Sequence, residues 1–171
     1  MRFVCFVTLI GCILLTPAAA LATAQTPEIL VYEGKTENMF SEPRIPVDNP
    51  RVRAIPQEEF ERKAKDGTFP GIVSSTACWR QYIGSWEIKD DRLFLTNVIG
   101  MFELSGEEPL FADWYSGVLR VPRGEILKNV HMGYDTVYEE FLHIRVENGL
   151  VAGTKIIDNR NDNDSDDLQP K

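Results

Sequence analysis

The segment FLHIRVENGLVAGTKI, residues 141–156, carries the strongest structural signal in the sequence. Two runs of alternating apolar and polar residues flank Asn148-Gly149, a dipeptide that favours a tight hairpin turn. A two-residue turn there places Val146 opposite Val151, on the face that includes Ile144. On the other face, the same register places Arg145 opposite Ala152 and His143 opposite Thr154. The segment therefore predicts an antiparallel hairpin.

A second hairpin is predicted upstream, in YIGSWEIKDDRLFLTNVI, residues 82–99. With Asp90-Asp91 as a two-residue turn, large apolar residues of the two strands face each other. The expected pairs are Lys89 with Arg92, Ile88 with Leu93, Trp86 with Leu95 and Tyr82 with Ile99. A slip of one residue would split these pairs between the two faces, so the pattern specifies the register.

Shorter segments extend the β pattern in both directions. Residues 28–32, EILVY, read as a first strand that ends at Glu33-Gly34. Residues 114–121 and 125–131 are expected to pair around the turn-like sequence Pro122-Arg123-Gly124. Strands joined by tight turns predict a mainly β fold, a single antiparallel meander that is either closed as a barrel or folded as a sandwich.

One segment, QEEFERKAK at residues 57–65, has the features of a helix. Its acids precede its bases, which suits the helix dipole, and Gly67 follows it. It has few apolar residues, so we expect a short surface helix packed through Phe60 and Ala64. The preceding residues 39–56 are rich in proline and are expected to form an extended connector over the surface.

The first 24 residues have the features of a signal peptide. Arg2 supplies a positive charge, residues 3–15 are apolar, and ATA at residues 22–24 provides the small residues of a cleavage site before Gln25. The apolar run is too short to span a bilayer, which takes about 20 residues. We therefore expect a periplasmic or secreted protein with no transmembrane segment in the mature chain.

A second interpretation of the N-terminus remains open, because LIGC at residues 9–12 matches a lipobox and Cys12 could then be lipidated. In either case residues 25–157 are expected to form a single β-rich domain. Residues 158–171, DNRNDNDSDDLQPK, have almost no apolar content and predict a disordered acidic tail.

The charge of the chain argues against some partners. The 171 residues carry a net charge of −8, and removal of residues 1–24 takes away Arg2 and no acid, which leaves −9. Binding to nucleic acid requires clustered Lys and Arg to neutralise phosphates, so a nucleic-acid partner is not expected. Docking on an anionic lipid surface is disfavoured for the same reason.

Cys78 is the only cysteine expected in the mature chain, so no disulfide framework is possible. A nucleophilic thiol needs a lowered pKa and usually a histidine within hydrogen-bond reach. Only His131 and His143 could serve, and Arg80 could stabilise a thiolate. The alternative, which we favour, is a small buried side chain beside Trp79.

Metal and cofactor motifs are not found in the sequence. Two isolated histidines and one cysteine do not match a zinc site. Residues 162–167 resemble the start of a calcium loop, but Asp167 occupies the position that needs glycine. No cofactor is therefore expected. A pair of carboxylates that could hydrolyse glycosides stays possible, since several acids lie in or near predicted strands: Glu87, Glu103, Asp113, Asp135 and Glu139.

Aromatic side chains offer the other candidate site. Trp86 belongs to the apolar face of its hairpin and is expected in the core. Trp114 and Tyr115 are adjacent, so in a strand they would point to opposite faces and one of them would lie outside the core. Tryptophan and tyrosine give large contact areas with a polar group, which suits ligand binding.

Four segments together resemble a family of small uncharacterised exported bacterial proteins. These are STACWRQY (residues 75–82), WEIK (86–89), ADWYSG (112–117) and HMGY (131–134), and the resemblance covers roughly residues 29–157. The family pattern carries glycine after Cys-Trp-Arg, where this chain has Gln81. The resemblance implies no named activity and supplies no catalytic residue.

These observations favour an exported, non-catalytic binding or interaction module, whose partner could be a protein, as for an inhibitor or immunity-like protein, or a small molecule. The alternative is a small extracytoplasmic enzyme that uses Cys78 with a histidine, or a carboxylate pair. No catalytic residue is assigned. The candidate binding residues are Cys78, Trp79, Arg80, Tyr82, Trp114, Tyr115 and His131.

Overall fold

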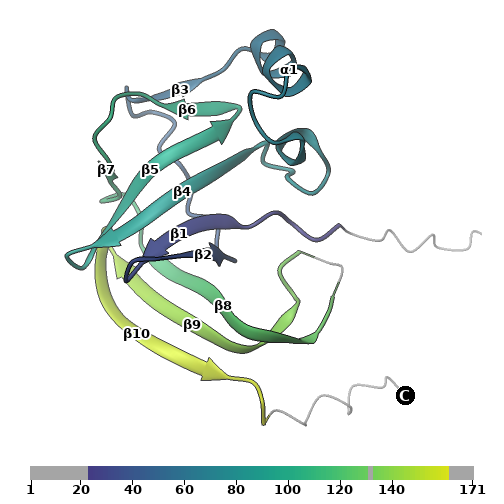
Figure 1. The fold of residues 1–171 in the computed structure, drawn as a ribbon. Helices are drawn as coiled ribbons and strands as arrows, with labels where there is room; N and C mark the ends of the chain where they lie inside the picture. Colours follow the sequence, from purple (N-terminus) through teal and green to yellow (C-terminus); the bar gives the residue numbers. More distant parts are fainter. Residues whose placement is uncertain (1–22, 131–132, 162–171) are drawn as a thin grey trace, which may run out of the picture.

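The computed structural model describes residues 23–130 and 133–161, and this part of the chain is mainly β with one α-helix (Figure 1). Its elements in chain order are β1 (Glu28–Tyr32), β2 (Lys35–Met39), β3 (Val52–Ala54), α1 (Gln57–Lys65), the 3₁₀ helix η1 (Gly71–Ser74), β4 (Tyr82–Lys89), β5 (Arg92–Gly100), β6 (Phe102–Leu104), β7 (Leu110–Phe111), β8 (Gly117–Lys128), β9 (Val137–Glu147) and β10 (Leu150–Asp158). The mainly β fold with one short helix confirms the predicted class.

Most strands belong to one large sheet in the order β2-β1-β4-β5-β10-β9-β8, with β7 paired to β5. The strands β3 and β6 form a separate antiparallel pair, which lies with α1 at one end of the molecule (Figure 1). In the described part of the chain the sheet is not a closed barrel, although the N–H of Phe40, just after β2, donates to the carbonyl of Arg120 in β8. None of the described helices is long and apolar enough to cross a bilayer.

The first strand joins the sheet in a way that the sequence did not indicate. β1 forms a hairpin with β2, whose turn residues Glu33 and Gly34 both have positive φ, as expected at Glu33-Gly34. On its other side β1 runs parallel to β4, with Leu30 opposite Trp86. The sheet is therefore mixed, and the parallel pair depends on a contact between segments far apart in the sequence.

The β4–β5 hairpin confirms the predicted turn and the pairs next to it. Asp90 and Asp91 have φ of 51° and 56°, and the pairs Lys89–Arg92, Ile88–Leu93 and Trp86–Leu95 form as expected. The pairing of Tyr82 with Ile99 is wrong, because Thr96 is an extra residue on β5 and Tyr82 lies opposite Gly100 instead. The Thr96 hydroxyl donates to the carbonyl of Ser85 at this bulge.

The β9–β10 hairpin likewise confirms its turn and contains a bulge beyond it. Val146 lies opposite Val151, but Ala152 is an extra residue, so Arg145 faces Gly153 and His143 faces Lys155. The predicted partners Ala152 and Thr154 are therefore shifted by one position. A bulge adds local twist, and β10 curves strongly in the lower part of Figure 1.

Residues 117–128 correct another prediction, because they form the single strand β8 rather than two strands around Pro122-Arg123-Gly124. β8 pairs with β9 along its length, and the register shifts between Arg123 and Ile126. Gly124 has a φ of 78°, and a β-carbon there would overlap the side chain of Glu139. The turn-like residues thus form a bulge within a strand.

The helix α1 covers the predicted residues and buries Phe60, while Ala64 is partly buried. The connector before it differs from the prediction, because it does not simply run over the surface. It contains β3 and buries Pro43 and Ile45. Apolar residues between the prolines attach this segment to the sheet.

The core has two parts. The larger lies within the sheet around Trp86 and includes Leu30, Leu95, Leu119 and Ile144. The smaller lies under α1 and η1 and consists of Ile55, Phe60, Phe69, Val73, Cys78 and Ile83. The loop from η1 to β4 lies at the boundary of the two parts, and it carries the residues of the candidate site.

Candidate functional site

The centre of the site is the guanidinium of Arg80, whose side chain is only 4% exposed. Its Nε lies 2.8 Å from Oε1 of Glu28, and its Nη1 donates to Oε1 of Glu42 at 2.7 Å. Its Nη2 donates to the carbonyl of Thr26 at 2.9 Å. The contact with Glu28 is an ion pair without hydrogen-bond geometry, since neither Arg80 Nε nor Glu28 Oε1 has a hydrogen-bond partner. One arginine therefore holds three segments of the chain together.

Glu28 is the buried charged residue of the described core, with 0% exposure. Its Oε2 accepts a hydrogen bond of 3.0 Å from the indole nitrogen of Trp86. Gly84 makes room for this carboxylate, because a β-carbon there would overlap Oε2. Burial raises the pKa of Glu28 to about 7, despite the opposing attraction of Arg80.

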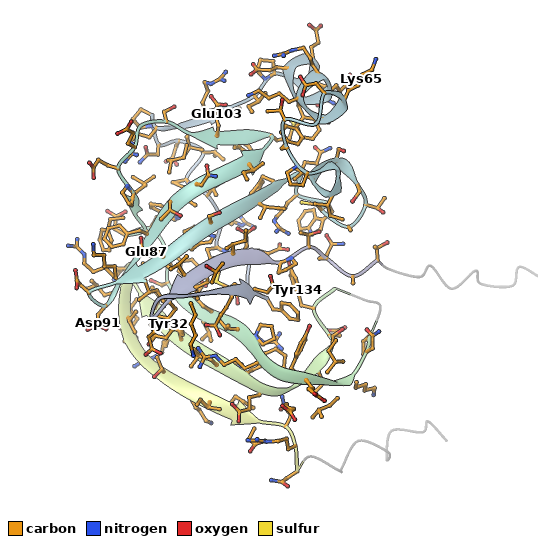
Figure 2. All side chains as sticks on the ribbon, viewed as in Figure 1. Tyr32, Lys65, Glu87, Asp91, Glu103 and Tyr134 are labelled. Atoms are coloured by element: carbon orange, nitrogen blue, oxygen red, sulfur yellow. The ribbon has the colours of Figure 1, made fainter. Side chains whose placement is uncertain are left out.

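Tyr134 closes the network from the loop between β8 and β9, next to the N-terminal end of β1 (Figure 2). Its hydroxyl lies 2.8 Å from the carbonyl of Thr26 and 2.7 Å from Oε1 of Glu42. Burial, and then the hydrogen bond to Glu42, raises the pKa of Tyr134 well above its usual value. Burial lowers the pKa of Arg80, but the carboxylates and Tyr134 more than offset this, so Arg80 stays charged.

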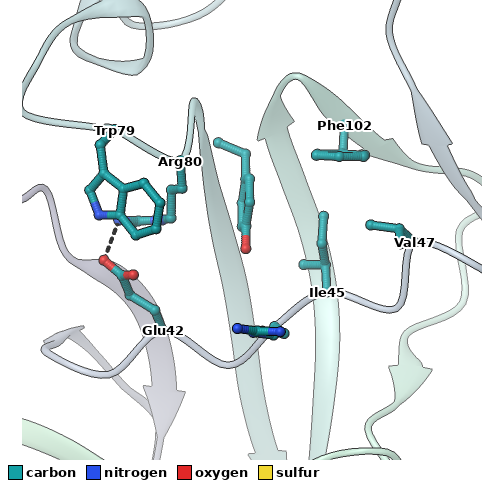
Figure 3. Close-up of a pocket in the computed structure, with 8 residues that line it drawn as sticks. Glu42, Ile45, Val47, Trp79, Arg80 and Phe102 are labelled. Atoms are coloured by element: carbon teal, nitrogen blue, oxygen red, sulfur yellow. Dashed lines mark hydrogen bonds and ion pairs between the residues drawn. The ribbon is translucent and has the colours of Figure 1, made fainter.

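A pocket of about 670 Å³ opens beside this network. Figure 3 shows Trp79, Arg80 and Glu42 on one side and Ile45, Val47 and Phe102 on the other. Arg44 and Tyr82 complete the lining. The volume is within the usual range of small-molecule sites, and the lining combines apolar surface with a few charged groups.

Trp79 stands at the rim of the pocket and is 70% exposed, the most exposed large apolar side chain of the described residues. Its backbone is nevertheless fixed on both sides. Its N–H donates to Oε1 of Gln25, and the next residue, Arg80, is anchored in the buried network. Gln81 then turns the chain into β4 with a φ of 58°, a conformation that glycine adopts more readily than other residues.

Cys78 does not have the properties of a nucleophile. Its side chain is fully buried in the smaller core, and its thiol donates to the carbonyl of Tyr82. Burial raises the pKa of Cys78, whereas a reactive thiol needs a lowered pKa. The residue has the structural role that we favoured from the sequence.

The structure brings together only part of the predicted site. Trp79, Arg80 and Tyr82 line the pocket, whereas Cys78 lies beneath it in the core. Trp114 and Tyr115 lie outside the lining. His131 falls outside the described residues.

Trp114 and Tyr115 are both half-buried and both pack against the larger core, because they lie in a turn and not in a strand. The expectation that they point to opposite faces therefore does not apply. Trp114 supports the pocket indirectly, since its indole nitrogen donates to the carbonyl of Arg44.

Sequence reasoning missed Glu28, Glu42 and Tyr134. Glu28 begins a strand that is otherwise apolar, and an acid on the inward side of such a strand is the one signal that could have marked it. Nothing in the sequence links Glu42 to Tyr134, which lie in a connector and a loop. Their meeting depends on the packing of β2 against β8.

No group of metal-ligating side chains is found in the described residues. Glu103, one of the acids considered for catalysis, is engaged by Arg53 and Lys63. No protein-family model, no curated protein and no solved structure matches the chain. The resemblance to a family of exported bacterial proteins therefore stays a prediction.

Proposed function

We propose that the chain is an exported, non-catalytic binding module that holds its ligand in the pocket between Trp79 and Phe102. The observation that carries this proposal is the 70% exposure of Trp79 at the rim of that pocket. Tryptophan left in water gives up the stabilisation that its burial would provide, and it is among the residues that dominate binding sites.

The buried network supports the same proposal. Removal of an ion pair from water costs more free energy than it usually returns, so a buried pair is weak evidence for stability. In this chain the network fixes Arg80, and thereby the backbone of Trp79, before any ligand arrives. A binding loop whose backbone is already held in place loses less entropy on binding than a mobile one.

The lining indicates the chemistry of the ligand. Trp79, Val47 and Phe102 offer an apolar surface for a flat or branched group. Among the described residues Arg44 forms no ion pair, and it is the exposed charge of the lining, since Arg80 is engaged by Glu28 and Glu42. We therefore propose a ligand that combines an aromatic or apolar group with a carboxylate, such as the end of a peptide.

A panel of dipeptides with a C-terminal aromatic residue tests this proposal, with the amidated dipeptides as matched probes. Affinities are measured by isothermal titration calorimetry, and in the proteins that keep Trp79 the NMR signal of its indole N–H reports where the ligand binds. We expect Trp79→Ala to weaken binding about tenfold or more, because an aromatic anchor contributes at least about 1.4 kcal/mol. Arg44→Gln should weaken binding of the acids and leave binding of the amides unchanged.

Ile126→Ala is the control, because Ile126 is an exposed apolar residue of β8 that does not line the pocket. It should bind as the unchanged protein does. If no dipeptide shifts the Trp79 signal, or if Trp79→Ala binds as tightly as Ile126→Ala, the proposed ligand site is wrong. Since Trp79 is exposed, its replacement should leave the unfolding temperature nearly unchanged.

A further inference from the structure

A row of basic side chains crosses the sheet on the face opposite the core. Arg120 of β8 lies directly opposite His143 of β9, and His143 lies directly opposite Lys155 of β10. Their neighbours Leu119 and Ile144 are buried, so by strand alternation the three basic side chains point to the other face. The bulge at Ala152 brings Lys155 into this row, because without it Thr154 would face His143.

This arrangement is unfavourable when His143 is protonated and no ligand is bound, because like charges directly opposite one another on neighbouring strands repel and destabilise the pair. Neither Arg120 nor Lys155 forms an ion pair with any described residue. Arg145, the next basic residue on this face, is by contrast paired with Glu147 at 2.6 Å. The row is thus an uncompensated positive cluster on a chain of net charge −8.

The row also borders a hollow of about 350 Å³, lined by Val118, His143, Arg145, Gly153, Thr154 and Lys155. Gly153 has no side chain, and this leaves space above the sheet between Arg145 and Lys155. The guanidinium carbon of Arg120 lies 4.7 Å from the ring centroid of Phe141, which holds that side chain along the sheet. Of the three residues of the row, His143 and Lys155 line this hollow, and Arg120 lies beside it, opposite His143.

We propose that this row and the hollow beside it form a second ligand site, which binds a phosphate or sulfate group through Arg120, His143 and Lys155. The site is separate from the Trp79 pocket and does not depend on the function proposed for it. A tetrahedral oxyanion presents several acceptor oxygens, and arginine, lysine and protonated histidine together present several charged donors. The anion would remove the repulsion within the row.

The protonation of His143 should couple to binding. Burial, and then the charges of Arg120 and Lys155, lowers the pKa of His143, so the ring is mostly neutral near pH 7. The charged groups near it on this face are Arg120 on β8, Arg145 and Glu147 on β9, and Lys155 on β10. A bound anion opposes their effect and raises the pKa of His143, and binding should therefore become tighter as the pH falls.

The test uses inorganic phosphate and sulfate at constant ionic strength, with the ring signals of His143 followed by NMR across a pH titration. We expect a saturable shift and a higher pKa of His143 in either anion than in chloride. Arg120→Gln combined with Lys155→Gln should weaken binding at least about tenfold, since two charge-assisted contacts are lost. Arg62→Gln with Lys65→Gln in α1 is the control, because it removes the same charge from a distant surface.

Vesicles that contain phosphatidylglycerol form a second arm, compared with vesicles of neutral lipid. Binding of free anions alone identifies a soluble ligand, and binding of vesicles that the double variant abolishes identifies a lipid headgroup; either result supports the oxyanion site. The proposal is overturned if neither probe binds, if chloride has the same effect, or if the double variant binds as the α1 control does. Unfolding without anion should show the double variant at least as stable as the unchanged protein, which separates loss of binding from loss of fold.

Discussion

Glu28 shows how much one side chain can depend on its surroundings. It lies on a strand of apolar residues, is fully buried, and has the Arg80 guanidinium on one oxygen and the Trp86 indole on the other. The same Arg80 also binds Glu42, so two carboxylates share one positive charge. This sharing, together with burial, makes the ionised form of Glu28 costly.

The pH dependence of stability follows from this cost. Burial raises the pKa of Glu28 from about 4.5 to about 7, so between these values the folded protein holds a proton that the unfolded chain has lost. The stabilisation is fully present below about 4.5 and is lost as the pH rises through about 7. The side chain introduced by Glu28→Gln cannot ionise, so the stability of this variant lacks the pH-dependent contribution of Glu28. We expect the stability of the unchanged protein, relative to Glu28→Gln, to fall by about 3 kcal/mol across this range.

Urea unfolding of both proteins at several pH values measures this difference. Other groups titrate in both proteins, and their contributions to stability cancel in the comparison. Glu103 is one of them, since the hydrogen bond from Arg53 lowers its pKa in both proteins. A difference that does not change with pH would show that Glu28 keeps an ordinary pKa in the folded protein.

Gly84 is the second residue on which the network depends. A β-carbon there would overlap Oε2 of Glu28 and lie 2.7 Å from Nε1 of Trp86, and both groups are fully buried. We expect Gly84→Ala to lower the free energy of unfolding by about 2–3 kcal/mol, as other overpacked cores do. Gly71→Ala is the matched control, because a β-carbon at Gly71 meets no atom within 4 Å. Equal thermal unfolding of the two variants would contradict this role for Gly84.

At the scale of elements, the sequence predicted the features that depend on residues close to one another in the chain. Two-residue turns at Asp90-Asp91 and Asn148-Gly149, the first strand and the helix α1 all follow from patterns within a few residues. The bulges at Thr96 and Ala152 were missed, because an extra residue in a strand leaves the apolar alternation near the turn intact. Pro122 and Gly124 suggested a turn, and only the long pairing of β8 with β9 shows that they bend a strand.

The β4–β5 turn offers a test at this scale. Asp90 and Asp91 both have positive φ, which aspartate tolerates less readily than glycine, the favoured residue at the second turn position, and their charges are adjacent. We expect Asp90→Asn with Asp91→Gly to raise the free energy of unfolding by about 1 kcal/mol, since the turn conformation is then intrinsically preferred. Glu107→Gln with Glu108→Gln, at two other exposed acids, controls for the loss of two negative charges. Denaturant midpoints that coincide for the two variants would contradict the argument.

At the scale of the whole molecule, the candidate site joins segments that the sequence keeps apart. Arg80 follows η1, Glu28 begins β1, Glu42 follows β2, and Tyr134 lies 108 residues from the Thr26 carbonyl that it approaches. Trp79 and Arg80 could be singled out from the sequence because aromatic and basic residues crowd there. Their partners could not be found, because the parallel pairing of β1 with β4 and the contact of β2 with β8 determine which side chains meet.

The residues just before β1 complete this assembly. The Thr26 carbonyl accepts a hydrogen bond from Arg80 and lies 2.8 Å from the Tyr134 hydroxyl, and the Thr26 N–H donates to the carbonyl of Ala77. A chain that begins at Gln25, as cleavage after Ala24 would leave it, keeps these contacts. A chain that begins at Pro27 loses both hydrogen bonds, and at about 1 kcal/mol each we expect it to be about 2 kcal/mol less stable.

Thr26→Ala separates the backbone from the side chain, because it keeps both the carbonyl and the N–H. We expect this variant to unfold at nearly the same urea concentration as the chain that begins at Gln25, whereas the chain that begins at Pro27 should unfold at a clearly lower one. The shortened chain should also bind ligand more weakly, because the loss of Gln25 frees the N–H of Trp79. If the chain that begins at Pro27 is as stable as the longer one, the segment before β1 does not hold the Arg80 network in place.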